Sequence, residues 1–246
     1  METTTYIALS RQGVLGREMS SIANNLANMN TTAFKGERMM FVDHLSRSRS
    51  DNFIADQTLA FVRDVASYTD FTEGAIKQTN NPLDLAIQGD GYFVVQAADG
   101  SEQYTRNGSF RMDSTGQLVT QSGAPVMTDA NTPIFFTQAD TTINIAGDGT
   151  VSSESGNIGK LRVVTFQDPY GVQRKASGFY TTDQQPIDKL DAGITQGGLE
   201  SSNISGILEM TRMIEVSRTY SSAQKMIDKE DERIRMAIRE LAKAGP

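Results

Sequence analysis

The side chains that most often carry out catalysis are scarce in this sequence. His44 is the only histidine, there is no cysteine, and no G-x-S-x-G element occurs. A Ser-His-Asp triad would therefore have to use His44, which follows Asp43 in a polar stretch, and thiolate nucleophiles are excluded. One histidine without cysteine leaves only carboxylates as metal ligands, and these suit cations harder than zinc. We predict no catalytic residue, no metal site and no cofactor.

Glycine-rich acidic segments offer a weaker chemical possibility. Gly-Asp-Gly occurs at 89–91 and at 147–149, and Asp113-Ser-Thr-Gly116 resembles part of a calcium-binding loop. None of the three has the alternating acidic ligands and the distal glutamate that an EF-hand requires. Tight hairpin turns explain all three segments, and we predict turns there.

Four asparagines stand within seven positions near the N-terminus: Asn24, Asn25, Asn28 and Asn30. Asparagine is a poor helix former and is neither a general acid nor a base, so this cluster indicates contacts rather than catalysis. Short amides can satisfy backbone groups where a helix ends, and they can bond to a neighbouring subunit where a charge would be unfavourable.

Two helices are expected to position these residues, one at each end of the sequence. The N-terminal apolar residues follow one another at steps of four and three: Leu15, Met19, Ile22, Leu26 and Met29. This is a narrow heptad pattern that weakens before Leu15. The same alternation near the C-terminus covers Met213, Val216, Tyr220, Ala223, Ile227, Glu230, Ile234, Ala237 and Leu241. It predicts a long helix from about Ser205 to Lys243, followed by Gly245-Pro246.

The sequence between the two helices has the character of short strands. From about Asp84, Asp-Gly, Asn-Gly and Ser-Gly pairs recur between runs of β-branched and aromatic residues, as in antiparallel hairpins. The fold class is therefore α+β, with an inserted, mostly antiparallel β domain. We expect an N-terminal helix in 1–35, an extended connector with some strand in 36–80, the β-rich domain in 81–200 and the C-terminal helix in 201–246.

Each predicted helix has too narrow an apolar stripe to be stable alone. We expect the two ends to pair as a coiled-coil-like module that other subunits complete. The predicted contact residues, within or between subunits, are Leu15, Met19, Ile22, Asn24, Asn25, Leu26, Asn28, Phe34, Met213, Val216, Tyr220, Ala223, Ile227, Ile234 and Leu241.

Charge and hydropathy restrict the possible partners. The formal net charge is −7, which argues against a nucleic-acid partner because phosphate neutralisation needs a basic face. The first 25 residues lack a basic segment followed by an apolar one, and no stretch approaches the roughly 18 apolar residues of a membrane span. We expect no cleaved signal peptide and no small-molecule substrate.

The segment "ANNLANMNTTAFKGER" resembles the N-terminal signature of the bacterial flagellar axial proteins, the rod, hook and hook-associated proteins. The signature is an apolar helix that ends in A-N-N-[LIV]-A-N and is followed by T-x-[GA]-[FY]-K, in which Ala33 takes the place of the usual glycine. "NPLDLAIQGDGYFVV", "YTRNGSFRMDSTGQLVTQSGAPV" and "LESSNISGILEMTRMIEVSRTYSSAQKMI" resemble further blocks of the same family, in the same order.

The resemblance implies a structural subunit of the flagellar basal-body rod in the periplasmic space. Its implied partners are other rod proteins, further copies of itself in a helical assembly around the export channel, and the flagellar type III export apparatus. The opening "YIALSRQ", the length and the short connector resemble a proximal rod subunit more than a distal one.

Two alternatives remain open at this point. The chain could be a distal rod subunit or another axial protein of the hook and basal body. A secreted β-domain adhesin or a hydrolase is the alternative from a different class. An adhesin should show an export signal and exposed apolar loops, whereas a hydrolase should show clustered titratable residues.

Overall fold

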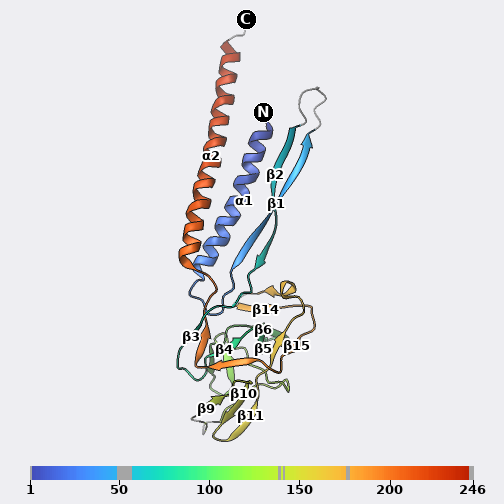
Figure 1. Cartoon of the computed structure of the whole chain (residues 1–246), viewed down its shortest axis with the longest axis vertical. Helices are drawn as coiled ribbons and strands as arrows, with labels where there is room; N and C mark the ends of the chain where they lie inside the picture. The colour runs from blue at the N-terminus through green and yellow to red at the C-terminus, as the bar shows by residue number, and fades with distance from the viewer. Residues whose placement is uncertain (1, 49–56, 138–139, 141, 176–177, 244–246) are drawn as a thin grey trace. The chain divides into compact units, whose positions relative to one another are not determined.

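The computed structural model describes residues 2–48, 57–137, 140, 142–175 and 178–243, and the chain forms two compact units (Figure 1). The first, here called the helix–hairpin unit, consists of Met1–Ala27, Glu37–Asp70 and Ser205–Pro246. The second, here called the β unit, consists of Asn28–Gly36 and Phe71–Ile204. The segment 28–36 thus belongs with the β unit although it directly follows the first helix.

Two long helices run antiparallel in the helix–hairpin unit. Helix α1 spans Glu2–Ala27 and helix α2 spans Gly206–Lys243, so the predicted C-terminal helix is confirmed. α1 is helical from Glu2 although its heptad pattern weakens before Leu15. It ends immediately before the asparagine-rich turn, where the Thr31 amide donates to the Asn28 carbonyl at 3.0 Å.

A long hairpin fills most of the segment that the sequence suggested as an extended connector. Strand β1 spans Glu37–Ser48 and strand β2 spans Gln57–Thr69, and they pair antiparallel from Glu37 opposite Thr69 to Ser48 opposite Gln57. β2 lies against α1 within the same unit (Figure 1). His44 lies within β1, opposite Phe61.

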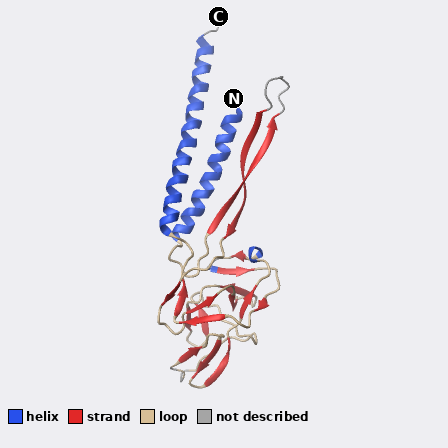
Figure 2. Ribbon diagram, viewed as in Figure 1, coloured by secondary structure: helices blue, strands red, loops and turns tan. Residues whose placement is uncertain are grey.

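The β unit is built from short strands (Figure 2). Their bounds are β3 Ile76–Gln78, β4 Leu85–Gln88, β5 Tyr92–Gln96, β6 Glu102–Thr105, β7 Phe110–Met112, β8 Leu118–Thr120, β9 Ile143–Ile145, β10 Thr150–Ser153, β11 Gly156–Lys160, β12 Val163–Thr165, β13 Gln173–Arg174, β14 Phe179–Thr181, β15 Ile187–Asp188, β16 Gly193–Gln196 and β17 Gly198–Glu200. A 3-10 helix, η1, spans Pro169–Gly171.

Antiparallel pairing dominates the β unit. The largest sheet has the order β13-β14-β6-β5-β12-β15, a three-stranded sheet has the order β11-β10-β9, and the pairs β16-β4, β17-β3 and β7-β8 complete the described strands. The described strand pairs are antiparallel. The α+β class with a mostly antiparallel β part is therefore confirmed.

The core of the β unit consists of apolar side chains from successive hairpins. Phe93 and Phe110 meet edge to face with ring centroids 5.2 Å apart, and Leu85, Leu118 and Ile134 are fully buried beside them. Aromatic pairs in this geometry contribute beyond the apolar area that they bury. A second buried cluster contains Val94, Tyr104 and Tyr180, so the short strands, which are too short to be stable alone, contribute to two apolar clusters.

Two of the three glycine-rich acidic segments form the predicted hairpin turns, since 113–116 joins the paired strands β7 and β8 and 147–149 joins β9 and β10. The prediction is wrong for 89–91, because β4 and β5 on either side of it belong to different sheets. Gly89 and Gly149 have φ values of +76° and +88°, which glycine adopts without steric penalty. The Asp113 carboxylate accepts hydrogen bonds from the backbone amides of Thr115 and Gln117 at 2.8 and 2.9 Å. The acidic side chain therefore stabilises the turn locally.

Gly108 provides a test of the packing in the β unit. A Cβ atom at this position would lie 1.8 Å from the Leu85 carbonyl oxygen, so we expect Gly108→Ala to reduce the free energy of unfolding by about 2 kcal/mol or more. Gly147→Ala is the control, because the nearest atom would be 3.8 Å away, and its expected effect is within about 0.5 kcal/mol. Urea unfolding followed by tyrosine circular dichroism measures both. Similar midpoints for the two variants would refute the packing argument.

Candidate functional site

The contact between α1 and α2 is the first candidate site, and the side chains at its centre are apolar. Leu15, Ile22 and Val216 are buried against one another. Partly buried side chains that pack on this cluster are Met19, Met213 and Tyr220. Apolar residues at heptad spacing on both helices thus meet along one face of each, as expected for an amphipathic helix pair.

Polar pairs flank the apolar contact and define its register. The side chains of Gln12 and Gln224 are hydrogen bonded to each other, and the Arg212 guanidinium lies 3.1 Å from the Glu18 carboxylate. A register shift between the helices would leave these groups without those partners. Polar side chains in an otherwise apolar helix interface are a common way of selecting one register.

The structure divides the predicted contact residues into three sets. Those that meet inside the helix pair are Leu15, Met19, Ile22, Met213, Val216 and Tyr220. Those that are partly or largely exposed are Asn24, Leu26, Asn28, Ala223, Ile227, Ile234 and Leu241. Asn25 and Phe34 form the third set, because both are buried within the chain itself.

Asn25 joins α1 to the start of the hairpin. Its side-chain nitrogen donates to the Glu37 carbonyl at 2.8 Å, and its side-chain oxygen accepts from the Glu37 amide at 3.0 Å. The amide therefore pairs with the first residue of β1 as a neighbouring strand would, at a position where only 2% of the residue is exposed. An asparagine at this helical position satisfies a backbone donor and acceptor that a longer or charged side chain would not match.

Asn25→Ala is expected to destabilise the helix–hairpin unit by about 1 to 3 kcal/mol, because both backbone groups of Glu37 lose a buried partner. Asn24→Ala changes the neighbouring, exposed asparagine of the same helix, and we expect an effect of about 0.5 kcal/mol or less. Amide hydrogen exchange at residues 37–40 compares the two variants. Equal protection in both would contradict this role of Asn25.

A buried ionic cluster in the β unit is the second candidate site. Lys35 Nζ lies 2.6 Å from Glu200 Oε1, and Arg106 Nε lies 2.7 Å from Glu200 Oε2. The exposed fractions of the three side chains are 3%, 6% and 2% for Lys35, Arg106 and Glu200. One carboxylate thus pairs with two cations away from bulk water, where charges are unfavourable unless they are paired and hydrogen bonded.

Backbone groups complete the ionic cluster. Lys35 also donates to the Thr72 carbonyl at 2.7 Å, and Glu200 accepts from the Gly74 amide at 3.0 Å. The Arg106 guanidinium donates to the carbonyls of Gly91 and Gly89 at 2.8 and 2.6 Å. The cluster therefore connects segments around residues 35, 73, 90, 106 and 200.

Burial and pairing act in opposite directions on the pKa values in the cluster. Burial lowers the pKa of Lys35, although the hydrogen bond and charge of Glu200 oppose this. Burial by itself raises the pKa of Glu200, but the charge of Arg106 and hydrogen bonds from Arg106 and Lys35 outweigh burial and leave the pKa below its ordinary value. Glu200 is thus held as the carboxylate.

Ala33 and Phe34, which precede Lys35, also make contacts within the β unit. The Ala33 amide donates to the Glu200 carbonyl at 2.8 Å, and the Phe34 ring lies 4.2 Å below the Arg174 guanidinium. Ala33 has a φ value of +55°, a conformation that favours glycine. Ala33 thus adopts the left-handed conformation that the usual glycine of the signature would adopt more readily.

The sequence did not single out Arg106 or Glu200. Lys35 was noted only as part of the N-terminal signature, and its partner Glu200 lies 165 positions later. The available signal for this cluster was Lys35 itself, which directly follows the apolar residues Ala33 and Phe34. A lysine buried among apolar residues needs an anionic partner, so a carboxylate elsewhere in the chain could have been expected to pair with it.

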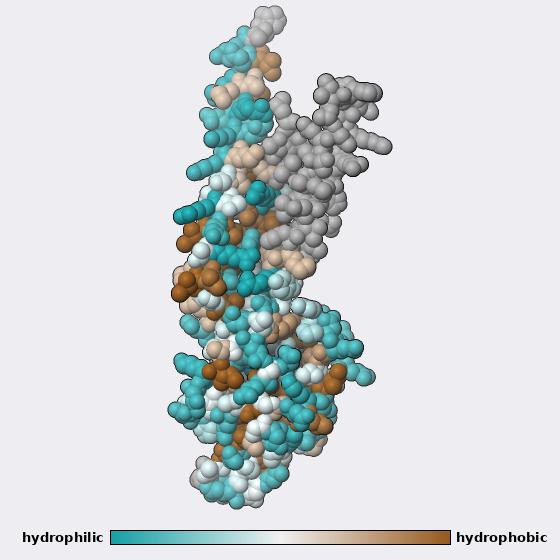
Figure 3. Space-filling view, in the orientation of Figure 1, coloured by the Kyte–Doolittle hydropathy of each residue, from teal (hydrophilic) through white to brown (hydrophobic). Residues whose placement is uncertain are grey.

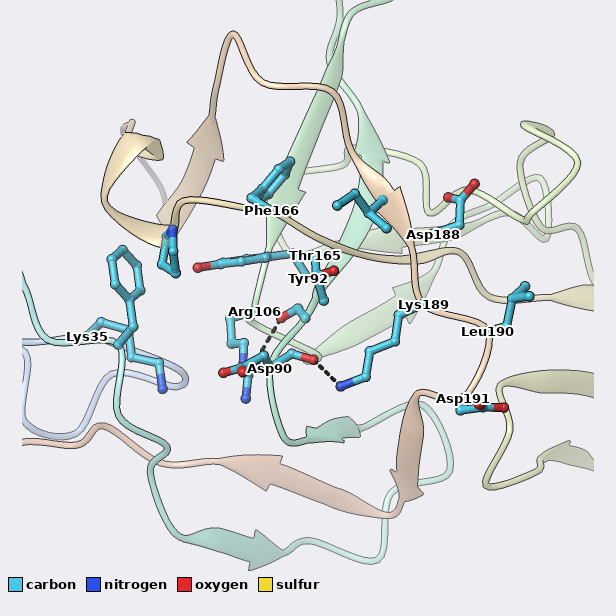
Figure 4. Close-up of a pocket in the computed structure, with 14 residues that line it drawn as sticks. Lys35, Asp90, Tyr92, Arg106, Thr165, Phe166, Asp188, Lys189, Leu190 and Asp191 are labelled. Atoms are coloured by element: carbon cyan, nitrogen blue, oxygen red, sulfur yellow. Dashed lines mark hydrogen bonds between the residues drawn. The ribbon is translucent and has the colours of Figure 1, made fainter.

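A cavity of about 600 Å³ opens beside this cluster within the β unit (Figure 4). Its lining includes Lys35, Arg106 and Tyr92, and burial raises the pKa of the Tyr92 hydroxyl. Lys189 donates to the Asp90 carbonyl at 2.7 Å across one side. The cationic side chains of the lining are therefore engaged with protein oxygens rather than arranged around a reacting group.

Metal binding and membrane insertion find no support in the described ranges. The described histidine, aspartate and glutamate residues form no group of three or more that could hold a metal ion. Neither of the described long helices has a segment apolar enough to cross a membrane.

Two family models match the chain. The flagellar hook protein FlgE/F/G D1 domain matches residues 86–153, and the C-terminal domain of the flagellar basal body rod FlgEFG proteins matches residues 195–240. The second match covers β17, Glu200 and most of α2.

Relatives resemble the chain over nearly its whole length. The flagellar basal-body rod protein FlgF of Caulobacter vibrioides is 37% identical, and the alignment covers 99% of each protein. FlgF of Salmonella typhimurium is 32% identical over 94% of this chain and 95% of the relative. A FlgG protein of Buchnera aphidicola is 34% identical over 87% of this chain and 90% of the relative.

Proposed function

We propose a mechanical role for this chain, which belongs to the FlgE/F/G family of flagellar rod and hook proteins and is most like the basal-body rod protein FlgF. It is a structural subunit of the flagellar basal-body rod, and it assembles with other axial proteins of the flagellum.

In the proposed mechanism, α1 and α2 form a coiled-coil-like pair that interleaves with the pairs of successive subunits. These helices surround the export channel, and contacts between subunits transmit the torque of the motor. Each contact joins different surfaces of two subunits, and repetition of such a contact produces an open helical filament when its rotation does not close a ring.

One observation carries this proposal. The helix pair buries only one face of each helix, while Ile234 and Leu241 of α2 remain exposed. Exposed apolar side chains on a long helix indicate further partners. The residues proposed to contact neighbouring subunits are Asn24, Leu26, Asn28, Ala223, Ile227, Ile234 and Leu241.

Export and location are further parts of the proposal. The chain travels through the flagellar type III apparatus to the periplasmic rod. The absence of cysteine supports export of an unfolded chain, because such a chain forms no incorrect disulfides in an oxidising compartment.

FlgG is the second candidate within the family. The FlgF relative from Caulobacter vibrioides is 37% identical and is covered almost completely, whereas the FlgG relative from Buchnera aphidicola is 34% identical and covers less of this chain. These values favour the proximal position in the rod. The β unit exposes apolar side chains such as Phe135, Tyr170 and Leu190, but the relatives that align over nearly the whole chain are rod proteins, so an adhesin or a hydrolase is not proposed.

The test is deletion of the gene in its own bacterium, followed by complementation with a tagged copy. We expect non-motile cells with incomplete rods, restored motility with the tagged copy, and the tag in purified basal bodies next to the most proximal rod proteins. Complete rods in the deletion strain would overturn the proposal. A tag at the hook side of the rod would assign the chain the distal position instead.

A further inference from the structure

Helix α2 carries a second apolar face near its start, in addition to the face that contacts α1. Ile207, Met210 and Ile214 are between 48% and 74% exposed. At 100° per residue, their shared side of the helix is roughly 120° away from the side that carries Met213, Val216 and Tyr220. Figure 3 shows hydrophobic surface on this part of α2. We call these three residues the N-terminal face of α2.

The face that contacts α1 continues to the C-terminal end of α2. Ile234, Ile238 and Leu241 are between 41% and 75% exposed, and Ile234 lies on the same side of the helix as Val216 because 18 residues complete about five turns. We call these three residues the C-terminal face of α2.

The length of α1 explains why the C-terminal face is exposed. Gln12 is bonded to Gln224 in the antiparallel pair, so Glu2, where α1 begins, lies level with about Ile234. α2 continues to Lys243. Its last residues therefore present the same apolar stripe beyond the point at which α1 can cover it.

We propose that these two faces form one contact between copies of this chain, in which the C-terminal face of one copy packs on the N-terminal face of the next. This inference rests on the proposed rod function and specifies the partner surface. Residues 207, 210 and 214 are separated by steps of three and four, and residues 234, 238 and 241 by steps of four and three. Each face therefore spans one heptad, which is the pattern of helices that pack side by side.

Two further observations support a second copy as the occupant. The C-terminal face is continuous with the α1–α2 contact, so a helix docked there extends an interface that already exists in the chain. Ser217 and Ser221 follow on the same side as the N-terminal face, and their small side chains allow close approach of a neighbouring helix. Because the two faces differ, each copy that binds one neighbour still presents the other face, so the contact can be repeated from copy to copy.

The absence of cysteine allows a direct test by cross-linking. The variant Ile214→Cys with Ile238→Cys is expressed in cells, and purified basal bodies are oxidised with copper phenanthroline. We expect disulfide-linked dimers and larger multimers of this chain on a non-reducing gel. Either single variant is expected to give none, because one face then lacks its thiol.

The matched control is Ile214→Cys with Lys229→Cys. Lys229 is exposed on the same helix but lies roughly 145° around it from the C-terminal face that it replaces in this pair, so we expect at least tenfold less multimer. Met210→Cys with Leu241→Cys supplies a second test pair if the first variant is excluded from basal bodies.

The outcomes separate this inference from the proposed function. Motile cells whose basal bodies contain the variants but give no multimer, or give a cross-link only to a different axial protein, would overturn the inference and leave the rod function intact. Absence of the unaltered chain from basal bodies would instead overturn the proposed function.

Discussion

Glu200→Gln is expected to reduce the free energy of unfolding of the β unit by about 3 to 5 kcal/mol, because it leaves the buried cations Lys35 and Arg106 without their shared anion. Glutamine retains the size of the side chain and can still accept hydrogen bonds, so a large loss would report on the missing charge rather than on a cavity. Urea unfolding of the purified chain at neutral pH measures the effect.

The control for this substitution is an ion pair in the same unit that water reaches. Arg162 pairs with Asp188 at 2.8 Å, but 58% of the Asp188 side chain is exposed. Asp188→Asn is therefore expected to change stability by less than about 1 kcal/mol. Equal losses of unfolding free energy for the two substitutions would contradict the argument that burial makes the loss of the Glu200 charge more destabilising.

The pH dependence of stability provides an independent check on Glu200. Its pKa in the folded chain is lower than in the unfolded chain, so the unfolded state binds the proton more readily. The stabilising contribution is complete above the unfolded pKa of about 4.3 and is lost as the pH falls through the folded pKa. The stability difference between wild type and Glu200→Gln should therefore be constant near neutral pH and shrink under acidic conditions. A difference that grows on acidification would contradict this assignment.

Ile22→Asp is expected to abolish motility and incorporation into the rod. Ile22 is 3% exposed in the contact between α1 and α2, so the substitution places an unpaired carboxylate in an apolar interface and destabilises the helix pair by about 3 kcal/mol or more. An energy of this size corresponds to more than a hundredfold change in an equilibrium constant. Swimming in soft agar and the content of purified basal bodies measure the two effects.

Ser20→Asp is the matched control for Ile22→Asp. It introduces the same charge two residues earlier, on an exposed side of α1, and we expect motile cells with normal rods. The urea midpoint of the β unit should be unchanged in both variants, since neither residue belongs to that unit. A motile Ile22→Asp strain with complete rods would show that the observed helix pair is not required for assembly.

The structural features that were predicted correctly from the sequence are those set by residues close to one another along the chain. The nine heptad positions from Met213 to Leu241 repeat a helical period, and α2 occupies Gly206–Lys243. The segments 113–116 and 147–149 form hairpin turns because glycine and aspartate favour turn geometry by their own conformational and hydrogen-bonding properties.

The pairing of β1 with β2 was not predicted from the sequence. The segment 36–80 suggested an extended connector with some strand, whereas the described residues show twelve residues of β1 paired with β2. Its polar stretch around Ser46 and Arg47 lacks the alternation that marks a half-buried strand. The pairing and the contact of β2 with α1 specify the hairpin instead.

The sequence by itself determined the α+β class, the two terminal helices and membership of the axial family, because helical period, turn chemistry and signature motifs all lie in short stretches of chain. Only the tertiary structure decided how individual polar residues are used. Asn25 pairs with the backbone of Glu37, and Lys35 and Arg106 meet Glu200 across separations of 165 and 94 residues. Such partners are selected by burial, since a charge or amide removed from water must bond to whatever the fold places beside it.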